Sequence, residues 1–446
     1  MTGRQKKQHS LSPNIAASVF LFIAAIAAAV IANSSWAPAY QQFLSHDLHL
    51  QIGDFNLFSH GGKSLKMIEF INDGLMTFFF VMVGLEIKRE LLVGELSSFR
   101  KASLPFVAAC GGMLFPVLIY MLFCSPDTDG GQGVAIPMAT DIAFSLGVLS
   151  LLGNRVPLSL KVFLTAFAVV DDIGGILVIA LFYSSHVSIG YLLVAAMLYA
   201  IVFYFGKWGA TNKVFFFIFG VMIWYLFLQS GIHSTISGVI LAFVIPAKPR
   251  MDVGKYIERI RATVAEFPTM DKDSIVLTNS QIEKLKEVES ASDRVISPLQ
   301  SLEDNLHGVV DFLILPLFAF VNAGVVFSGG GDLMGNVSIA VGVGLILGKF
   351  IGIYLFTWLA IRLNISPMPQ GMTWANLSGI ALLGGIGFTV SLFIANLSFG
   401  TDFPVLLNQA KFGVLSGSIL AGFLGYIVLS IILRKEHERE VAGKKN

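Results

Sequence analysis

Charged residues are scarce in this chain of 446 residues, because aspartate, glutamate, lysine and arginine make up only 13% of it. A soluble domain carries about 25% charged residues. The net charge is +1, so the composition does not indicate a strongly charged partner such as nucleic acid. The sequence therefore argues against an ordinary soluble protein and favours one that lies largely in a membrane.

Cysteine is almost absent, and the common patterns of enzyme sites are missing. The two cysteines, Cys110 and Cys124, fall in one apolar segment, so we interpret them as small core residues rather than as a disulfide or metal pair. The sequence has no phosphate-binding loop, metal-ligand spacing or Ser-His-Asp pattern. We therefore expect neither an enzyme nor a bound cofactor.

Apolar segments of about 20 residues, the length that crosses a bilayer as a helix, recur along most of the chain. Hydrophobic residues make up 55% of it, and its 44 glycines suit close helix packing in lipid. The basic start with Arg4, Lys6 and Lys7 leaves a signal peptide as an alternative, but the length of the first segment favours an uncleaved helix. The sequence predicts an all-α polytopic membrane protein with twelve transmembrane helices, at residues 15–33, 68–86, 104–124, 134–151, 160–183, 187–206, 213–229, 231–246, 309–327, 337–361, 375–397 and 409–433.

Lysine and arginine are concentrated in alternate loops, and this asymmetry predicts the orientation. The loops on the side of the N-terminus hold Lys88, Arg89, Arg100, Lys101, Arg155, Lys161, Lys207, Lys213 and Arg362. The opposite loops hold only Lys63 and Lys66, with Lys411 at the outer interface of the last span. We therefore expect both termini in the cytoplasm.

Two segments outside the spans stand out in what we treat as a single transporter domain, 1–446. In the outer loop, 36–67, alternating apolar residues flank Gly53-Asp54, which predicts a small β-hairpin. An isolated hairpin is marginally stable, so we expect it to pack on a second copy of the chain, with a merely ordered loop as the alternative. Residues 247–308 form a charged cytoplasmic insertion, with helical spacing from Val253 to Val264 and a second helix starting near Asn279. We interpret it as a solvated helical cap, with a regulatory domain as the alternative.

Four ionisable residues lie deep in the predicted spans: Asp141, Asp171, Asp172 and Lys349. A charge at the bilayer centre costs about 2.5–3.5 kcal/mol even on the lenient scale, so such residues are functional candidates. At about 1.5 Å per residue, Asp171 lies about 17 Å into its span and Lys349 about 18 Å into its own, and both depths are close to the midplane. Adjacent helical residues point about 100° apart, so one aspartate can face a cation path and the other Lys349.

Two spans carry breaks at mid-depth. The fourth contains Gly133, Pro137 and Thr140-Asp141, and the eleventh contains 384–387, Gly-Gly-Ile-Gly, followed by Thr389. Such breaks persist only where they are buried in protein or line a cavity. They fall in the middle helices of spans 3–5 and 10–12, which predicts inverted repeats with the site between them. We expect Asp141 to offset the positive half-helix ends and Lys349 the negative ones, with a simple helix cap as the alternative for Asp141.

Seven motifs of this chain resemble those of bacterial sodium/proton antiporters of the NhaA type, and the resemblance covers all twelve spans. The motifs are INDGLMTFFFVMVGLEIKREL (71–91), ATDIAFSLGVL (139–149), FAVVDDIGGILVIALFY (167–183), SGIHSTISGVI (230–240), LPLFAFVNAGV (315–325), GKFIGIYLF (348–356) and GGIGFTVSLFIA (384–395). The resemblance implies exchange of cytoplasmic Na⁺ or Li⁺ for external H⁺ in the bacterial inner membrane, in pH and sodium homeostasis.

The same resemblance implies roles for individual residues. Asp172 would be the central cation carboxylate, with Asp171 alternating between a proton and a salt bridge to Lys349. Thr140 and Asp141 would lie at the break of the fourth span, next to the transported Na⁺. The residues implied in structure, pH response or the cytoplasmic mouth are Asp73, Glu86, Arg89, Glu90, His233, Glu303 and His307.

The chain departs from the resemblance near the mouth. Compact members of the family carry two basic residues and a histidine where this chain has Gln300, Ser301 and Asp304. Asp311 replaces a residue that is usually apolar, and we interpret it as a solvated interfacial residue, with attraction of cations as the alternative. These differences concern the pH range of activity rather than transport itself.

Competition between Na⁺ and H⁺ for the same carboxylates would couple the two ions, and two carboxylates with a releasable lysine would make the exchange electrogenic. A proton-coupled solute symporter is the first alternative, and it requires a larger pocket. An intramembrane aspartyl protease is a remote alternative, because a buried lysine would disturb its proton-sharing pair of aspartates.

Overall fold

The computed structural model describes residues 13–52, 55–60, 63–184, 187–208, 212–249, 252–267, 276–327 and 333–443. In these residues the structure is mostly helical. The helices are α1 (Pro13–Ala32), α2 (Ala37–Leu44), α3 (Met67–Glu69), α4 (Met76–Val93), α5 (Phe99–Phe123), α6 (Ile142–Leu151), α7 (Leu158–Phe182), α8 (Ile189–Lys207), α9 (Lys213–Ser230), α10 (Thr235–Val244), α11 (Val253–Ala265), α12 (Asn279–Val295), α13 (Pro298–Val309), α14 (Leu315–Asn322), α15 (Asn336–Val343), α16 (Lys349–Arg362), α17 (Trp374–Leu383), α18 (Phe388–Phe399) and α19 (Pro404–Gly443).

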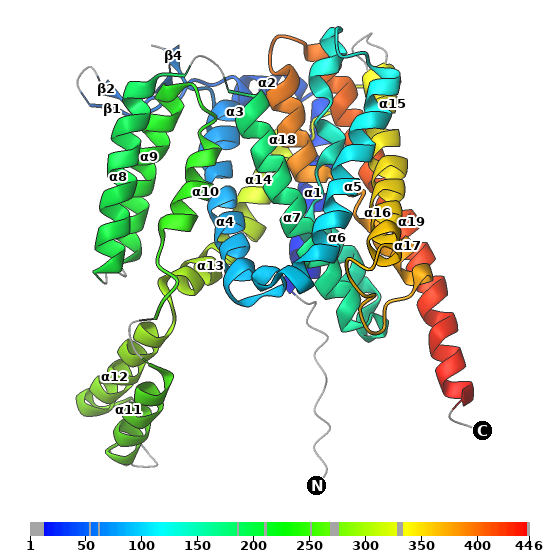
Figure 1. The fold of residues 1–446 in the computed structure, drawn as a ribbon. Coiled ribbons are helices and arrows are strands. Elements are labelled where there is room, and N and C mark those ends of the chain that lie inside the picture. The colour runs from blue at the N-terminus through cyan, green and yellow to red at the C-terminus, as the bar shows by residue number, and fades with distance from the viewer. Residues whose placement is uncertain are drawn as a thin grey trace.

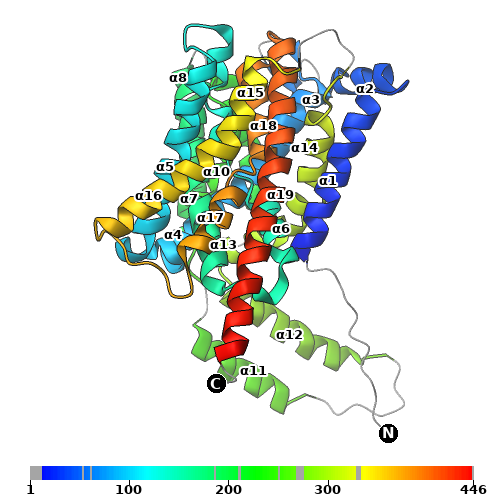
Figure 2. The ribbon, with the colours of Figure 1, turned by 90° about the vertical axis from the view of Figure 1, so that its right-hand side faces the viewer.

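Most of these helices stand side by side in one bundle (Figure 1). We call the end at which α1 begins and α19 ends the termini end, and the opposite end, where β1–β4 lie, the hairpin end (Figures 1 and 2). Large apolar side chains face outward from the bundle, for example Leu122 and Leu181, which are 82% and 76% exposed. An apolar exterior on this scale fits lipid rather than water.

Nine helical segments in the described residues are long and apolar enough to cross a membrane, or eleven if each of two bent pairs counts as one span. The protein is therefore a multi-pass membrane protein. The predicted span at 231–246 corresponds to α10, which has only ten residues, so the count of twelve stays a prediction. α10 ends at Val244, where the Lys88 ammonium donates to the Phe243 carbonyl at 2.7 Å and also to that of Ile245. A positive charge at the C-terminal end of a helix is stabilising, because it compensates the partial negative charge of the helix dipole there.

Three of the long spans contain a π-helical turn: η1 (Phe70–Leu75), η6 (Val310–Ile314) and η7 (Gly344–Gly348). These turns join α3 to α4, α13 to α14 and α15 to α16, giving the continuous spans Met67–Val93, Pro298–Asn322 and Asn336–Arg362. The second of these begins at Pro298 rather than at the predicted residue 309. π-turns are rare and are frequent at functional sites. Here Asp73 and Asp311 lie within two of them, and Lys349 directly follows the third.

Two short hairpins stand at the hairpin end. β1 (Gln51–Ile52) pairs antiparallel with β2 (Phe55–Asn56) in the register Ile52 to Phe55. β3 (Ser59–His60) pairs with β4 (Lys63–Ser64) in the same way. The strands flank the predicted turn, but Gly53 and Asp54 themselves lie outside the described residues.

The charged insertion contains α11 and α12, which pack against each other beyond the termini end of the bundle (Figure 2). α12 begins at Asn279, as expected, with the capping box of Thr278 and Gln281. Ion pairs join the two helices, between Lys284 and Glu266 at 2.7 Å and between Arg259 and Glu287 at 3.2 Å. These charges keep the insertion soluble next to an apolar bundle.

Small residues allow the helices around the bundle centre to approach closely. α5 and α16 cross where Gly111 meets the carbonyl of Gly352 and Gly352 meets the carbonyl of Gly111. A β-carbon at either position would collide with the opposing backbone, so the crossing requires glycine. α5 packs in turn against α7, which carries Asp171 and Asp172, so the crossing places Lys349, at the start of α16, close to these aspartates.

Candidate functional site

The two predicted breaks are present, and they cross each other. Short 3₁₀ turns within Asp129–Met138 precede α6 with a bend of 46°, and α17 is bent from α18 by 44°. Four of the hydrogen bonds that connect the breaks end on backbone carbonyls. They run from Thr140 Oγ1 to Gly384 (2.8 Å), from Asp141 N to Ile386 (2.6 Å), from Ser145 Oγ to Leu383 (3.0 Å) and from Ser391 Oγ to Ile136 (2.7 Å). Backbone groups freed by each break are thus satisfied by the other segment, as lipid requires.

Asp141 lies at the centre of this crossing and binds both half-helices. Its Oδ1 accepts from the backbone N–H of Phe144 at 2.9 Å, so it caps α6. Its Oδ2 accepts from Thr389 twice, from the backbone N–H at 3.1 Å and from the hydroxyl at 2.6 Å. The carboxylate therefore faces the positive ends of both α6 and α18, which agrees with the role expected for it.

Asp171 and Lys349 form a completely buried ion pair. Lys349 Nζ lies 2.7 Å from Asp171 Oδ2, and neither side chain is exposed at all. The ammonium also lies 5.6 Å from the centre of the Phe167 ring, which adds a cation–π contact. The other oxygen, Asp171 Oδ1, makes no hydrogen bond of good geometry in the described part of the chain, although Thr140 lies beside the carboxylate. Lys349 thus faces one of the two adjacent aspartates, an arrangement that the sequence allowed for.

Asp172 has different surroundings from its neighbour on α7. It is 9% exposed and lines a cavity of about 120 Å³ together with Thr140, Asp141 and Thr389. Among the described residues it makes no hydrogen bond or ion pair. Asp171 therefore faces the lysine, whereas Asp172 faces the cavity. Asp172 is a carboxylate in the cavity wall that has no ion-pair partner among the described residues.

The donors around this cavity suit a small, hard cation better than a resident transition metal. Apart from the imidazole of His307, they are carboxylate and hydroxyl oxygens, and the described residues contain no group of three or more His, Cys, Asp or Glu placed to hold a metal.

The mouth residues gather at the termini end of the same cavity. Arg89 Nε lies 2.9 Å from Glu303, and the guanidinium also lies 3.3 Å from Glu90 and 3.9 Å from Glu86. Glu86 lines the cavity, as do His307 and Asp311, which lie 3.8 Å apart. One arginine therefore ties the end of α4 to α13 beside the cavity opening.

Comparison with known proteins decides the family. The protein-family model described as Na⁺/H⁺ antiporter 1 matches residues 8–429. The chain belongs to this family. Two relatives named Na(+)/H(+) antiporter NhaA are 77% identical over 97% of this chain and 99% of the relative, from Bacteroides thetaiotaomicron, and 72% identical over 98% and 100%, from Bacteroides fragilis. A third, from Syntrophotalea carbinolica and named Na(+)/H(+) antiporter NhaA 2, is 41% identical over 94% of this chain and 95% of its own length.

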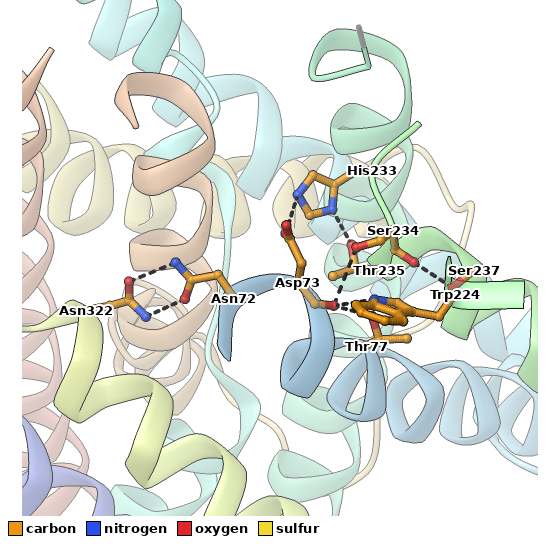
Figure 3. Close-up of polar contacts among 9 residues, drawn as sticks. All are labelled: Asn72, Asp73, Thr77, Trp224, His233, Ser234, Thr235, Ser237 and Asn322. Atoms are coloured by element: carbon orange, nitrogen blue, oxygen red, sulfur yellow. Dashed lines mark hydrogen bonds and ion pairs between the residues drawn. The ribbon is translucent and has the colours of Figure 1, made fainter. Parts of the chain in front are cut away.

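Two residues implied by the antiporter resemblance lie apart from the mouth. Asp73 is in η1, near the hairpin end of its span, where its carboxylate lies 3.4 Å from His233 Nε2 (Figure 3). The other ring nitrogen, Nδ1, lies 2.8 Å from the hydroxyl of Thr235. The Asp73 carbonyl accepts from the indole of Trp224 at 3.1 Å. The pair thus faces the hairpin end, separated from Arg89 by most of the length of α4.

Sequence reasoning missed two sets of residues around the site of this antiporter family member. Thr389 was seen only as a polar residue after a break, although it supplies both donors to Asp141 Oδ2. Three asparagines within the spans, Asn72, Asn322 and Asn396, were not singled out, although they bond to one another. Amides in apolar helices were the signal for them, because a buried amide requires partners.

Proposed function

We propose that this chain is a secondary active transporter that exchanges Na⁺ or Li⁺ for H⁺. The observation that carries the proposal is the contrast between two neighbouring carboxylates, Asp171 paired with Lys349 and Asp172 alone at a cavity. A desolvated charge without a partner is costly, and either a proton or a sodium ion removes that cost. The two ions therefore compete for one carboxylate, which is the basis of their exchange.

Asp172 is the carboxylate at which this competition takes place. Asp141 lines the same cavity, but three hydrogen bonds already compensate its charge. Asp172 has no such donors, so a cation gains more from it. The carboxylate of Asp141 and the hydroxyl of Thr140 are the further oxygen ligands, and oxygen is the ligand that hard cations prefer.

Lys349 makes the exchange electrogenic. When a proton binds at Asp171, the carboxyl loses its negative charge, so the lysine loses its ion-pair partner and is released. Two carboxylates and a releasable amine then carry more protons than sodium ions in a cycle. The net charge moved would make the membrane potential a driving force, worth about 2.3 kcal/mol per charge at 100 mV.

The termini end would face the cytoplasm of a bacterial cell, with the chain in the inner membrane. Lysine and arginine in the short loops support this orientation. We count twelve spans, with α10 as the short one, and two inverted repeats formed by spans 3–5 and 10–12. The crossing of their first helices at Gly111 and Gly352 and the crossing of the two broken spans support this symmetry.

Two further roles complete the proposal. Glu86, Arg89, Glu90, Glu303 and His307 would set the pH response at the cytoplasmic mouth, and Asp73 with His233 would contribute from the hairpin end. The hairpins β1–β2 and β3–β4 would join two copies of the chain into a homodimer, since strands this short gain stability from a partner.

The cavity favours this function over a solute symporter. Its volume of about 120 Å³ has room for an ion and a few waters, whereas pockets for organic ligands measure about 300–1,000 Å³. An aspartyl protease would need two facing aspartates that share a proton, but here Asp171 faces Lys349.

Replacement of Asp172 by asparagine tests the assignment. Everted vesicles that hold a pH gradient report exchange as collapse of the gradient when sodium is added. Asp172→Asn should remove this response while the protein still inserts in normal amount, because the amide binds neither a proton nor a cation at the cavity. Asp402→Asn, which removes an exposed carboxylate, is the matched control and should respond normally. A normal response from Asp172→Asn would refute the assignment.

A further inference from the structure

Three helices each place one phenylalanine and one asparagine between the cavity and the hairpin end. The span that contains η1 and α4 contributes Phe80 and Asn72, α14 contributes Phe318 and Asn322, and α18 contributes Phe393 and Asn396. We call the first three side chains the phenylalanine layer and the other three the asparagine layer. None of these six residues has a role in the ion site described above.

The order from cavity to layers follows one face of each helix. On α18, Thr389 lines the cavity, and Phe393 and Asn396 follow at four and seven residues along the chain. Residues at this spacing lie on one side of a helix. The rise places the asparagine about 10 Å beyond the cavity wall.

α14 repeats this order. Leu315 lines the cavity, and Phe318 and Asn322 follow at three and seven residues. On α4, Val83 and Phe79 line the cavity, Phe80 lies beside Phe79 with their ring centres 5.3 Å apart, and Asn72 lies nearer the hairpin end in the π-turn. The same sequence of cavity, ring and amide on three helices marks a path that is closed in this structure.

The phenylalanine layer is tightly closed. Phe393 is completely buried, and its ring centre lies 5.5 Å from that of Phe80 and 6.4 Å from that of Phe318. The imidazole of His233 covers the same ring edge-on at 5.3 Å. Aromatic rings at van der Waals contact leave no room for a hydrated ion, and apolar constrictions of this kind gate by excluding water.

The asparagine layer ties the same three helices together. Asn322 donates to Asn72 Oδ1 at 2.7 Å and accepts from Asn72 Nδ2 at 3.2 Å, so the two amides bond in both directions (Figure 3). Asn322 Oδ1 also accepts from Asn396 Nδ2 at 2.8 Å. Asn322 is completely buried and therefore holds the centre of the layer.

The π-turn η1 connects one span to both the asparagine layer and the phenylalanine layer. Asn72 and Asp73 are neighbours in it, and their side chains point in different directions, toward Asn322 and toward His233 (Figure 3). The span is thereby fixed on one side to the asparagine layer and on the other to the imidazole that covers Phe393. Movement of η1 would disturb both layers at once.

We propose that the two layers form a closed gate between the cavity and the hairpin end, with Asn322 as its central positioning residue. The gate must open before an ion at Asp172 leaves at that end, so the inference rests on the proposed function for what passes. Amides suit a contact that opens and closes. When the gate opens, the separated amides can form hydrogen bonds with the water that enters, whereas a buried amide without a hydrogen bond is costly. The rings exclude ions while the gate is shut, and the amides hold it shut.

Labelling from the two sides of the membrane tests the gate without any ion gradient. Val390 lines the cavity below the rings, so Val390→Cys is the reporter, in a chain with Cys110→Ala and Cys124→Ala. A cationic, membrane-impermeant thiol reagent is added to vesicles of either orientation. The reporter should react from the termini end and only slowly from the hairpin end. Asn322→Ala should raise the rate from the hairpin end at least about tenfold, because three inter-helix hydrogen bonds are lost.

Asn376→Ala is the matched control, because Asn376 is equally buried but caps α17 with Thr373, outside the layers. It should lower stability without changing the rate from the hairpin end. An unchanged rate in Asn322→Ala, or an equal rise in Asn376→Ala, would overturn the gate. If Asn322→Ala does not insert, Asn396→Ala removes one hydrogen bond between helices, the one to Asn322, besides a bond to Leu392 within α18. It should give a smaller rise, and the absence of that rise would also overturn the gate. If the reporter is labelled as expected but the protein with native residues at these positions shows no sodium–proton exchange, the proposed function is refuted and the gate is not.

Discussion

Replacement of Lys349 by alanine should strongly destabilise the protein, because it leaves Asp171 as a buried charge with no partner. The lysine supplies the 2.7 Å contact to Oδ2, and Oδ1 has no hydrogen bond among the described residues. Removing one partner of a buried pair costs about 3–5 kcal/mol. At roughly 2 °C per kcal/mol, the low end of the range for large domains, the unfolding midpoint should fall by about 6–10 °C.

The measurement is thermal unfolding of the purified protein in detergent, with a double variant as the decisive comparison. Asp171→Asn with Lys349→Met removes both charges and keeps most of the side-chain volume. Because a buried ion pair is often no more stable than neutral groups of its size, the double variant should recover most of the loss. Lys207→Ala, which removes an exposed lysine, is the control and should leave the midpoint unchanged. A normal midpoint in Lys349→Ala, or a double variant as unstable as the single one, would refute the reasoning.

Two further predictions concern the crossing of the broken helices and the insertion. Thr389→Val removes the 2.6 Å hydroxyl bond to Asp141, so it should cost about 1–3 kcal/mol in thermal unfolding and weaken the sodium dependence of exchange; unchanged values for both would contradict the role of this bond. The hydrogen bond from Lys284 lowers the pKa of Glu266 below its usual value, so the pair's stabilisation of the contact between α11 and α12 is present above the ordinary glutamate pKa and lost as the pH falls through the lowered one. The protection of these helices against hydrogen exchange, measured relative to the intrinsic exchange rate at each pH, should therefore fall at low pH. Glu266→Gln should remove this dependence, and equal pH dependence of protection in both forms would contradict it.

Sequence reasoning located the helices and the depth of the charges well, for a physical reason. Bilayer thickness sets the length of each span, so Asp171 and Lys349 could be placed at similar depth by counting residues. The structure brings them to 2.7 Å. The breaks at Asp141 and Gly384 were predictable in the same way, because lipid does not satisfy free backbone groups.

Contacts that depend on packing between distant spans could not be derived in this way. Counting places Asp73 on the same span as Arg89, but only the fold shows that its carboxylate meets His233 at the opposite end from the mouth. The start of α13 at Pro298 was missed because residues 298–308 are too polar to be recognised as the beginning of a span. The π-turns were also missed, since they depend on packing with neighbouring helices rather than on a local pattern.

Ion coupling in liposomes tests the central claim most directly. Purified protein is reconstituted, and uptake of radioactive sodium is followed together with the internal pH. Because one carboxylate, Asp172, would hold either ion but never both, every entry of sodium should be accompanied by release of acid equivalents, and Asp172→Asn should abolish both fluxes together. Sodium uptake without any proton counterflow at every pH would contradict the account.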